Sequence, residues 1–189
     1  MKQISGASKE LLLDRELSFT LRGSSTLKQK VGKVFALLRD PVYRYLFRVL
    51  GDPEEAEDLT QEVFLRLYSC LHQGQGLGNI RAWVFRVAHN LAIDRQRKKL
   101  LFEPFDQGVW NQTRDSAPGA EERVLDEERH SRLQYVLEQL SASERQCLEL
   151  RAEGLSYQEI ADVLEMRLPT LAKYLGRIIK KLVREIAND

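Results

Sequence analysis

The last third of the chain carries a dense group of basic side chains that could bind a polyanion. Between Arg167 and Arg184 six residues are basic and none is acidic. They are Arg167, Lys173, Arg177, Lys180, Lys181 and Arg184. Such a group favours nucleic acid, because each phosphate contact releases condensed counterions. The pattern predicts a nucleic-acid-binding helix, and the alternative is an ordinary helical hairpin with a solvated basic face.

A second stretch combines aromatic, basic and amide side chains in the way that single-stranded nucleic acid requires. One face of a predicted helix carries these groups, and further ones lie beside it. They are Trp83, Arg86, Asn90 and Arg97 on the face, with Arg81, Phe85 and His89 at its edges. Bases stack on aromatic rings, cations follow the phosphates, and an amide can read a base edge. Trp83 and Phe85 could equally be partly buried core residues, so the pattern alone leaves both interpretations open.

A third group is acidic and lies near the predicted start of another helix. At positions i, i+3, i+4 and i+7 this helix presents Asp58, Gln61, Glu62 and Leu65 as one contiguous stripe. Such a stripe could dock a basic or amphipathic partner helix. The pattern alone favours a plain solvent face, because acids stabilise the N-terminal turns of any helix.

The C-terminal basic helix is preceded by the sequence of a short, capped helix. Ser156 and Glu159 form a capping box at its start. Ser141 with Glu144 starts the helix before it in the same way, and Gly154 ends that helix. A short capped helix, a tight turn and a longer basic helix predict a helix-turn-helix DNA-binding unit.

Positions 33 to 100 have the periodicity of three helices. Gly51 ends the first, within which Pro41 predicts a bend or a break. Asp52 followed by Pro53 starts the second, and the third begins near Asn79 after a glycine-rich loop. The predicted core positions are Phe35, Leu38, Val42, Leu46, Val49, Leu59, Val63, Leu67, Leu71, Ile80, Val84, Val87, Ala88 and Leu91.

These patterns predict an all-α protein of two small helical domains joined by a flexible linker, with the helix-turn-helix in the C-terminal domain. Residues 1–32 show no sustained period and are expected to form a poorly ordered N-terminal extension. The first domain covers 33–100. Prolines and glycines mark 101–123 as the linker, and the second domain covers 124–189.

The composition argues against an enzyme, a metal site and a membrane span. Cys70 and Cys147 lack metal-ligand spacing and are expected to be buried or half-buried free thiols. No phosphate-binding glycine loop or nucleophile–base pair is evident, so no catalytic residue, metal or cofactor is expected. No apolar run approaches the ~20 residues that cross a bilayer. With no signal peptide either, we expect a cytoplasmic protein without membrane contact.

Four segments carry motifs in a characteristic order and spacing. They are Gly51–Leu67 (GDPEEAEDLTQEVFLRL), Arg81–Arg95 (RAWVFRVAHNLAIDR), Leu140–Arg145 (LSASER) and Leu155–Ala161 (LSYQEIA). Together they resemble the small, two-domain extracytoplasmic-function (ECF) group of sigma-70 family RNA polymerase sigma factors. The resemblance extends over nearly everything after position 32. It implies a factor that binds core RNA polymerase and directs promoter-specific transcription initiation, with no catalytic chemistry of its own.

The resemblance also implies a role for each predicted surface. The acidic stripe of Asp58, Gln61, Glu62 and Leu65 would grip the clamp helices of the largest polymerase subunit. The first domain would open the −10 element and flip a non-template base into a pocket, using Arg81, Trp83, Arg86, His89, Asn90, Arg95 and Arg97. The second domain would read the −35 duplex, using Arg167, Thr170, Lys173, Tyr174, Arg177, Lys180 and Lys181. An anti-sigma factor is a further partner that the family allows.

The second domain departs from the family pattern around its turn and its basic helix. Glu165 stands where glycine is usual, and Arg167 stands where a small capping serine is common. Ala172 and Tyr174 replace a lysine and an arginine, which removes about two phosphate contacts from the salt-dependent affinity. We therefore expect recognition of the −35 element to be weak, altered or assisted by another protein.

Two other functional classes fit the residues less well. A free-standing helix-turn-helix regulator would bind DNA without polymerase, commonly as a dimer, but it would leave the first domain without a role. An enzyme acting on nucleic acid could use the carboxylates between Asp52 and Glu62 as metal ligands. Those acids lie in the first turns of a helix, however, where capping and the helix dipole account for them.

Overall fold

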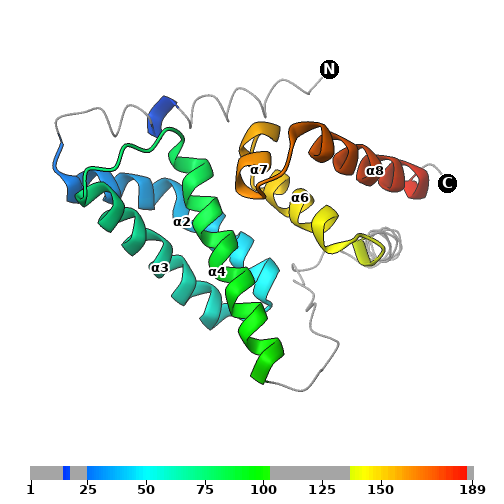
Figure 1. Cartoon of the computed structure of the whole chain (residues 1–189), viewed down its shortest axis with the longest axis horizontal. Helices are drawn as coiled ribbons and strands as arrows, with labels where there is room; N and C mark the ends of the chain where they lie inside the picture. The colour runs from blue at the N-terminus through cyan, green and yellow to red at the C-terminus, as the bar shows by residue number, and fades with distance from the viewer. Residues whose placement is uncertain (1–14, 18–24, 103–136, 187–189) are drawn as a thin grey trace, which may run out of the picture.

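The structure is a computed structural model that describes residues 15–17, 25–102 and 137–186. Over these ranges the elements are all helical (Figure 1). They are α2 (Leu27–Leu50), α3 (Pro53–His72), α4 (Ile80–Phe102), α6 (Ala142–Ala152), α7 (Tyr157–Val163) and α8 (Leu168–Ile186). The predicted all-α fold class is confirmed. Positions 103–136, which contain most of the predicted linker and the predicted start of the second domain, lie outside the described residues.

The first domain consists of α2, α3 and α4. The predicted signals at Gly51 and Asp52 determine where α2 ends and where α3 begins. Gly51 ends α2 with a left-handed φ of 74°. Asp52 then caps α3, because its Oδ1 accepts the backbone N–H groups of Glu54 and Glu55 at 2.9 and 3.0 Å. These local bonds fix where the chain reverses and so bring α3 alongside α2.

Each helix of this domain buries one face in a shared core. Tyr45 of α2 is fully buried and lies edge-on to the buried ring of Phe85 of α4, with ring centroids 5.8 Å apart. Phe35, a predicted core residue, instead lies at the rim, where it is 37% exposed and packs edge-on to Phe64. Predicted core positions that are buried include Leu38, Val42, Leu46, Leu59, Val63, Leu67, Ile80, Val84 and Ala88.

The helix α2 differs from expectation in two respects. It begins at Leu27 rather than near position 33, because Thr26 and Gln29 form a capping box that the apolar pattern did not reveal. It also continues through Pro41 without the predicted break. The next residue, Val42, is fully buried in the core, and packing of this kind outweighs the ~3 kcal/mol that proline costs inside a helix.

The second domain contains α6, α7 and α8. The two predicted capping boxes are both formed, at Ser141 with Glu144 and at Ser156 with Glu159. Gly154 has a φ of 81° where α6 ends. The short helix α7, a tight turn at Glu165 and the longer helix α8 make up the predicted helix-turn-helix.

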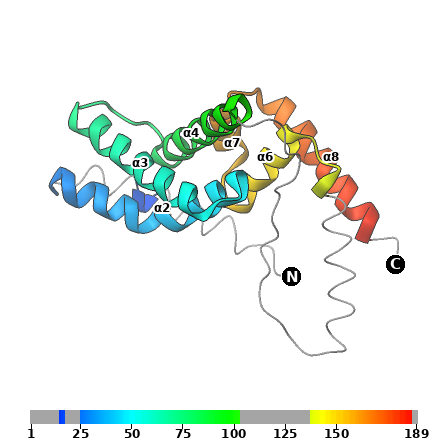
Figure 2. The same ribbon diagram turned by 90° about the horizontal axis from the view of Figure 1, so that it is seen from below.

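The two domains are in direct contact, which the sequence did not predict. The helix α4 packs against α7, and α2 contacts α6 (Figure 2). Buried apolar side chains of both domains belong to one continuous cluster. The face of α4 that was predicted to bind nucleic acid is therefore partly an internal surface.

Candidate polymerase and nucleic-acid interfaces

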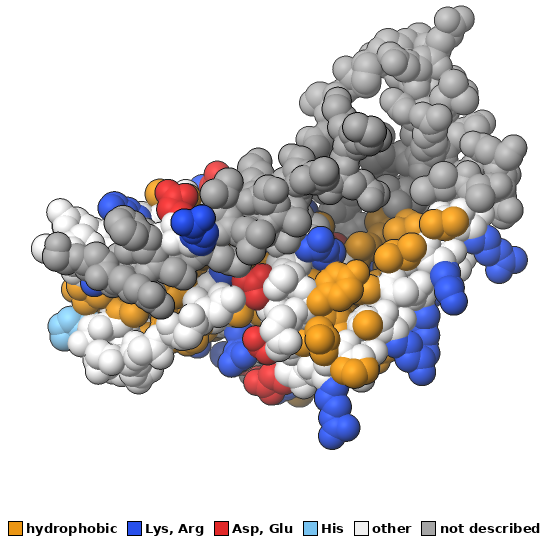
Figure 3. Space-filling model, turned by 90° about the horizontal axis from the view of Figure 1, so that it is seen from above, with side chains coloured by type: hydrophobic (Ala, Val, Ile, Leu, Met, Phe, Trp, Pro, Cys, Tyr) orange, Lys and Arg blue, Asp and Glu red, His pale blue; other side chains and the backbone are white. Residues whose placement is uncertain are grey.

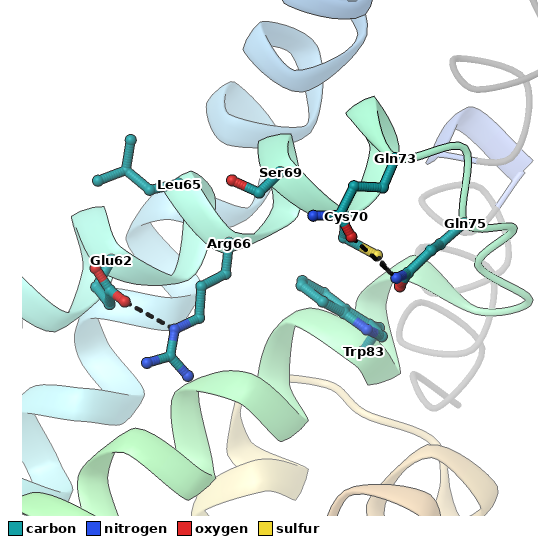
Figure 4. Close-up of a pocket in the computed structure, with 8 residues that line it drawn as sticks. All are labelled: Glu62, Leu65, Arg66, Ser69, Cys70, Gln73, Gln75 and Trp83. Carbon is teal, nitrogen blue, oxygen red and sulfur yellow. Dashed lines mark hydrogen bonds and ion pairs between the residues drawn. The ribbon is translucent and has the colours of Figure 1, made fainter.

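A pocket of about 410 Å3 opens between α3, the loop that follows it and the start of α4 (Figure 4). Side chains from all three segments line it. They are Glu62, Leu65, Arg66, Ser69, Cys70, Gln73, Gln75 and Trp83. In Figure 4 the indole ring of Trp83 projects from α4 towards the end of α3, and Gln75 projects from the loop beside it.

Local hydrogen bonds position the groups around this pocket. Asn79 caps α4, since its Oδ1 accepts the backbone N–H of Ala82 at 2.9 Å, and this sets the turn that carries Trp83. At the other side the Cys70 thiol donates to Oε1 of Gln75 at 3.2 Å. The Gln75 amide in turn donates to the Gln73 side chain at 3.2 Å. The loop amides are thus tied to the end of α3, opposite the indole.

This arrangement can bind a flat, polar ring. The half-buried indole of Trp83 offers a stacking face, and stacking of a base on an aromatic side chain contributes roughly 1–3 kcal/mol. The amides of Gln73 and Gln75 supply donors and acceptors for a base edge. Neither glutamine was among the predicted site residues, because the glycine-rich loop was interpreted only as the end of a helix. Gln73 and Gln75 lie in the sequence between the acidic stripe and Trp83, and this position could have indicated that they belong to the site.

The acidic stripe lies along the exposed side of α3. Asp58 and Gln61 are exposed, and Leu65 is 64% exposed although it is apolar. Glu62 accepts a hydrogen bond from Arg66 at 2.8 Å, which leaves its second oxygen able to accept another partner. Tyr68, one turn beyond Leu65, is also exposed and extends the stripe. The structure therefore brings the four predicted residues together on one accessible face.

Two of the arginines predicted to bind the −10 strand point into the second domain. Arg81 is 3% exposed, and its Nη2 donates to the backbone oxygen of Glu153 at 2.9 Å. Arg86 donates from Nε to the backbone oxygen of Asp162 at 3.0 Å. Both guanidinium groups therefore form hydrogen bonds to backbone oxygens of the second domain.

His89 is also turned inward, against α2. Burial raises the pKa of the Tyr45 hydroxyl, which therefore stays protonated and forms a hydrogen bond of 2.8 Å with His89 Nδ1. Burial lowers the pKa of His89 as well. The ring is therefore neutral near pH 7 and adds no positive charge to α4.

The remaining predicted residues of α4 lie towards its C-terminal half. Asn90 and Arg97 are exposed, and Arg97 is 3.9 Å from Asp94. Arg95 is half-buried, and its Nη1 lies 3.4 Å from a carboxylate oxygen of Glu55. With α4 packed against α7, the C-terminal half of α4 remains accessible, whereas the turns that carry Arg81 and Arg86 face the second domain.

The helix α8 carries most of its predicted DNA-binding side chains on the outside. Figure 3 shows basic and hydrophobic side chains gathered at the end of the molecule that α8 forms. The exposed members of the predicted set are Arg167, Thr170, Lys173, Arg177 and Lys180. The guanidinium of Arg177 lies 5.9 Å from the ring centroid of the half-buried Tyr174. Lys181 differs, because its ammonium donates to the backbone oxygen of Gln139 at 3.0 Å.

The turn before α8 has an unusual backbone. Glu165 adopts a φ of 51°, in the left-handed region that glycine adopts without strain. Its side chain is exposed, so no packing contact inside the core explains the choice of residue. The position at which the sequence departs from the family pattern is therefore also a strained one.

The other chemical groups give no sign of catalysis in the described ranges. Both cysteines are free and buried, as predicted, and burial raises the pKa of Cys147 to about 11. Among the residues that the structure describes, no group of three or more His, Cys, Asp or Glu could hold a metal ion. Within the same residues, no helix is both long and apolar enough to traverse a bilayer.

Comparison with known proteins gives the family. Residues 34–100 match the family described as Sigma-70 region 2, and residues 130–182 match the one described as Sigma-70, region 4. The ECF RNA polymerase sigma factor SigK of Mycobacterium ulcerans is 31% identical over 145 residues, which are 75% of this chain and 77% of that protein. The chain belongs to the ECF group of sigma-70 family sigma factors.

Further relatives agree with this membership. The ECF RNA polymerase sigma factor SigE of Mycolicibacterium smegmatis is 32% identical over 141 residues, covering 73% of this chain, which spans about half (54%) of SigE. The fold resembles that of RpoE from Bartonella quintana, solved with the anti-sigma factor NepR, at a TM-score of 0.60 and 20% identity. That likeness covers 84% of this chain and 97% of RpoE. As an ECF sigma factor the protein serves transcription initiation and is not an enzyme.

Proposed function

We propose that this ECF sigma factor uses three surfaces during initiation, of which the first two adjoin at Glu62 and Leu65. The exposed stripe of Asp58, Gln61, Glu62 and Leu65 docks on the clamp helices of the largest polymerase subunit. The pocket beside Trp83 captures one unstacked base of the −10 strand. The exposed basic side chains of α8 hold the −35 duplex. The first domain begins with α2 at Leu27, and the second extends over 124–189.

The observation that carries this proposal is the pocket between α3 and Trp83. It combines a half-buried indole with the amides of Gln73 and Gln75, and it adjoins the exposed stripe on α3. If polymerase binds along the stripe, a melted DNA strand held by the complex would lie close to the indole of Trp83, on which a base can stack. Capture of an unstacked base lowers the free energy of the open promoter, because it offsets part of the cost of unpairing.

Open-complex formation by the Trp83→Ala variant tests this role. Loss of about 1–3 kcal/mol of stacking should reduce open complexes roughly 5- to 150-fold. A run-off transcription assay with bacterial core polymerase on fragmented genomic DNA measures the product, and a pull-down measures polymerase binding. Retained polymerase binding with reduced transcription supports the pocket. Unchanged transcription, or equal loss of both, contradicts it.

A paired charge reversal tests the docking stripe. Changing Asp58 and Glu62 to lysine places repulsive charges where a basic partner helix would bind, so core polymerase should no longer be captured. The matched control is Glu16→Lys with Glu138→Lys, which changes the net charge equally at two exposed acids outside α3. Equal capture by the stripe variant and the control would remove the docking role.

The proposal also covers where the protein acts and how it is restrained. A factor that acts on bacterial promoter DNA would work in the cytoplasm, where that DNA lies. The anti-sigma factor in the RpoE structure supports a similar partner for this chain. Co-purification of the factor with a bound inhibitory protein, released on induction, is the measurement that identifies such a partner.

A further inference from the structure

The end of α3 holds Gln75 of the following loop at two points. Gly74 has a left-handed φ of 73°, which turns the chain back towards the helix. The backbone N–H of Gln75 then donates to the backbone oxygen of Cys70 at 3.2 Å. The Cys70 thiol in turn donates to Oε1 of the Gln75 side chain at 3.2 Å. Both the backbone and the side chain of Gln75 are therefore fixed by one residue of α3.

The hydrogen bond of the thiol decides which way the Gln75 amide faces. An amide has nearly the same shape when its oxygen and nitrogen are exchanged, so its hydrogen-bond partners fix its orientation. Because Oε1 accepts from the thiol, Nε2 points away from Cys70 and donates to Oε1 of Gln73 at 3.2 Å. This bond orients the Gln73 amide in the same way. The hydrogen bonds thus run in one direction, from the thiol through Gln75 to Gln73.

This series leaves N–H groups on the polar edge of the pocket beside Trp83. Each amide oxygen already accepts a hydrogen bond from the protein. Among the described residues, one N–H of Gln75 and both N–H groups of the Gln73 amide have no protein partner. Both glutamines are exposed, and Figure 4 shows them with Cys70 on the side of the pocket that faces the indole. The loop therefore presents hydrogen-bond donors to a ring that stacks on Trp83.

Donors on this edge discriminate between bases, whereas the indole does not. Stacking tolerates every base, because each base has a π face. Cytosine carries two adjacent acceptors, O2 and N3, and guanine carries O6 and N7. Adenine lacks such a pair, because its N1 and its N7 each lie beside the N6 amino group, which is a donor. A row of N–H groups therefore favours cytosine or guanine over adenine.

We propose that Cys70 is a positioning residue for base selection, because its thiol orients the amides of Gln75 and Gln73 so that the pocket prefers a base with two adjacent acceptors. This inference rests on the proposed capture of an unstacked base beside Trp83. Cys70 is 8% exposed and acts through Gln75 rather than on the base itself. Without the thiol, the Gln75 amide could rotate and place its oxygen where an N–H should meet the base.

Substitutions at Cys70 separate its role as a donor from its role in packing. Cys70→Ala removes the donor, and Cys70→Ser restores one at nearly the same place, so serine should rescue what alanine loses. The matched control is Cys147→Ala, which removes the other buried free thiol, in α6 of the second domain. Gln75→Glu tests the same edge at an exposed position, because a carboxylate can accept from the thiol but offers no N–H to a base.

The assay uses holoenzyme reconstituted from bacterial core polymerase and the full-length factor. The probes are labelled single strands with the −10 non-template sequence of a promoter found by run-off transcription, varied over all bases at each position. The captured position is the one where an abasic substitution weakens binding by wild-type holoenzyme but not by Trp83→Ala holoenzyme. At that position, base selection is the affinity for the better of cytosine and guanine divided by the affinity for adenine.

Wild-type factor and Cys147→Ala should show the same ratio in favour of cytosine or guanine, and Cys70→Ser should retain it. Cys70→Ala and Gln75→Glu should lower the ratio about fivefold, the effect of one misplaced neutral hydrogen bond. The extra negative charge of Gln75→Glu weakens binding to every probe alike and so cancels in the ratio. If Cys70→Ala loses its helical content by circular dichroism, Gln75→Glu decides the same question.

A wild-type preference for adenine would overturn the proposal, and so would an unchanged ratio in folded Cys70→Ala or in Gln75→Glu. Equal losses in Cys70→Ser and Cys70→Ala would also overturn it, because the thiol would then act by filling space. Failure of the proposed function is distinguishable, since no position would then show an abasic effect that depends on Trp83.

Discussion

The half-buried His89 should make this sigma factor sensitive to acid, with a sign that follows from its environment. Its pKa in the folded protein is lowered by burial, whereas the unfolded chain should have the ordinary value near 6.5. Below about pH 6.5 the unfolded state takes up a proton that the folded state does not. The stability associated with neutral His89 is therefore complete above that pH and is lost as pH falls towards the lowered pKa.

The size of this effect follows from the same linkage. Between pH 7.5 and 5.5 the free energy of unfolding should fall by at most about 1.4 kcal/mol for each pH unit below 6.5, because the two states differ by no more than one proton at this residue. The His89→Gln variant removes the titrating group, and its side-chain oxygen can still accept the hydrogen bond of Tyr45. It should therefore lose less stability over this pH range than the wild type does.

Urea unfolding followed by tryptophan fluorescence at the two pH values measures the difference. The matched control is His72→Gln, which makes the same substitution at an exposed position of α3. Contributions from Glu149 and other carboxylates cancel, since all three proteins contain them. The same loss of stability in His89→Gln and in the wild type would refute the assignment of acid sensitivity to the Tyr45–His89 pair.

Three further results are expected from local features. Glu165→Gly should raise the free energy of unfolding by roughly 0.5–1 kcal/mol. A left-handed backbone costs a non-glycine residue ~1–2 kcal/mol, and this exceeds the conformational entropy that glycine loses on folding. A lower melting temperature would contradict strain in this turn. Ser156→Ala should lower stability by about 1 kcal/mol in urea unfolding, since it removes the cap of α7, and the same stability as wild type would argue against the capping box. Cys147 should resist a thiol reagent at pH 8 in the folded protein, because burial raises its pKa to about 11; rapid labelling before unfolding would show that this core opens.

The starts of α3, α6 and α7 were predictable because their capping signals are local. Asp52 caps α3 through bonds to the next residues of the chain, and the boxes at Ser141 and Ser156 close over three residues each. Side chains that are close in sequence form such bonds regardless of the rest of the fold. The continuation of α2 through Pro41 was not predictable in this way, because it depends on core packing from α3 and α4.

The candidate site was predicted in part, and for a comparable reason. The stripe on α3 follows from helical spacing alone, and its four residues do share an exposed face. The partners of Arg81 and Arg86 could not be foreseen, because Glu153 and Asp162 lie more than 70 positions further along the chain. Helical spacing places a side chain on a face but does not say which distant element will cover that face.

The carboxylate of Glu159 has a consequence for how this sequence can evolve. One oxygen accepts the backbone N–H of Ser156 at 2.8 Å and so completes the start of α7, while the other accepts the Asn79 amide of the opposite domain. Aspartate is one methylene shorter and would not reach both partners from the same backbone position. A substitution at position 159 therefore removes a hydrogen bond within the second domain and another between the two domains. Among relatives that keep this packing, positions 79 and 159 should change together.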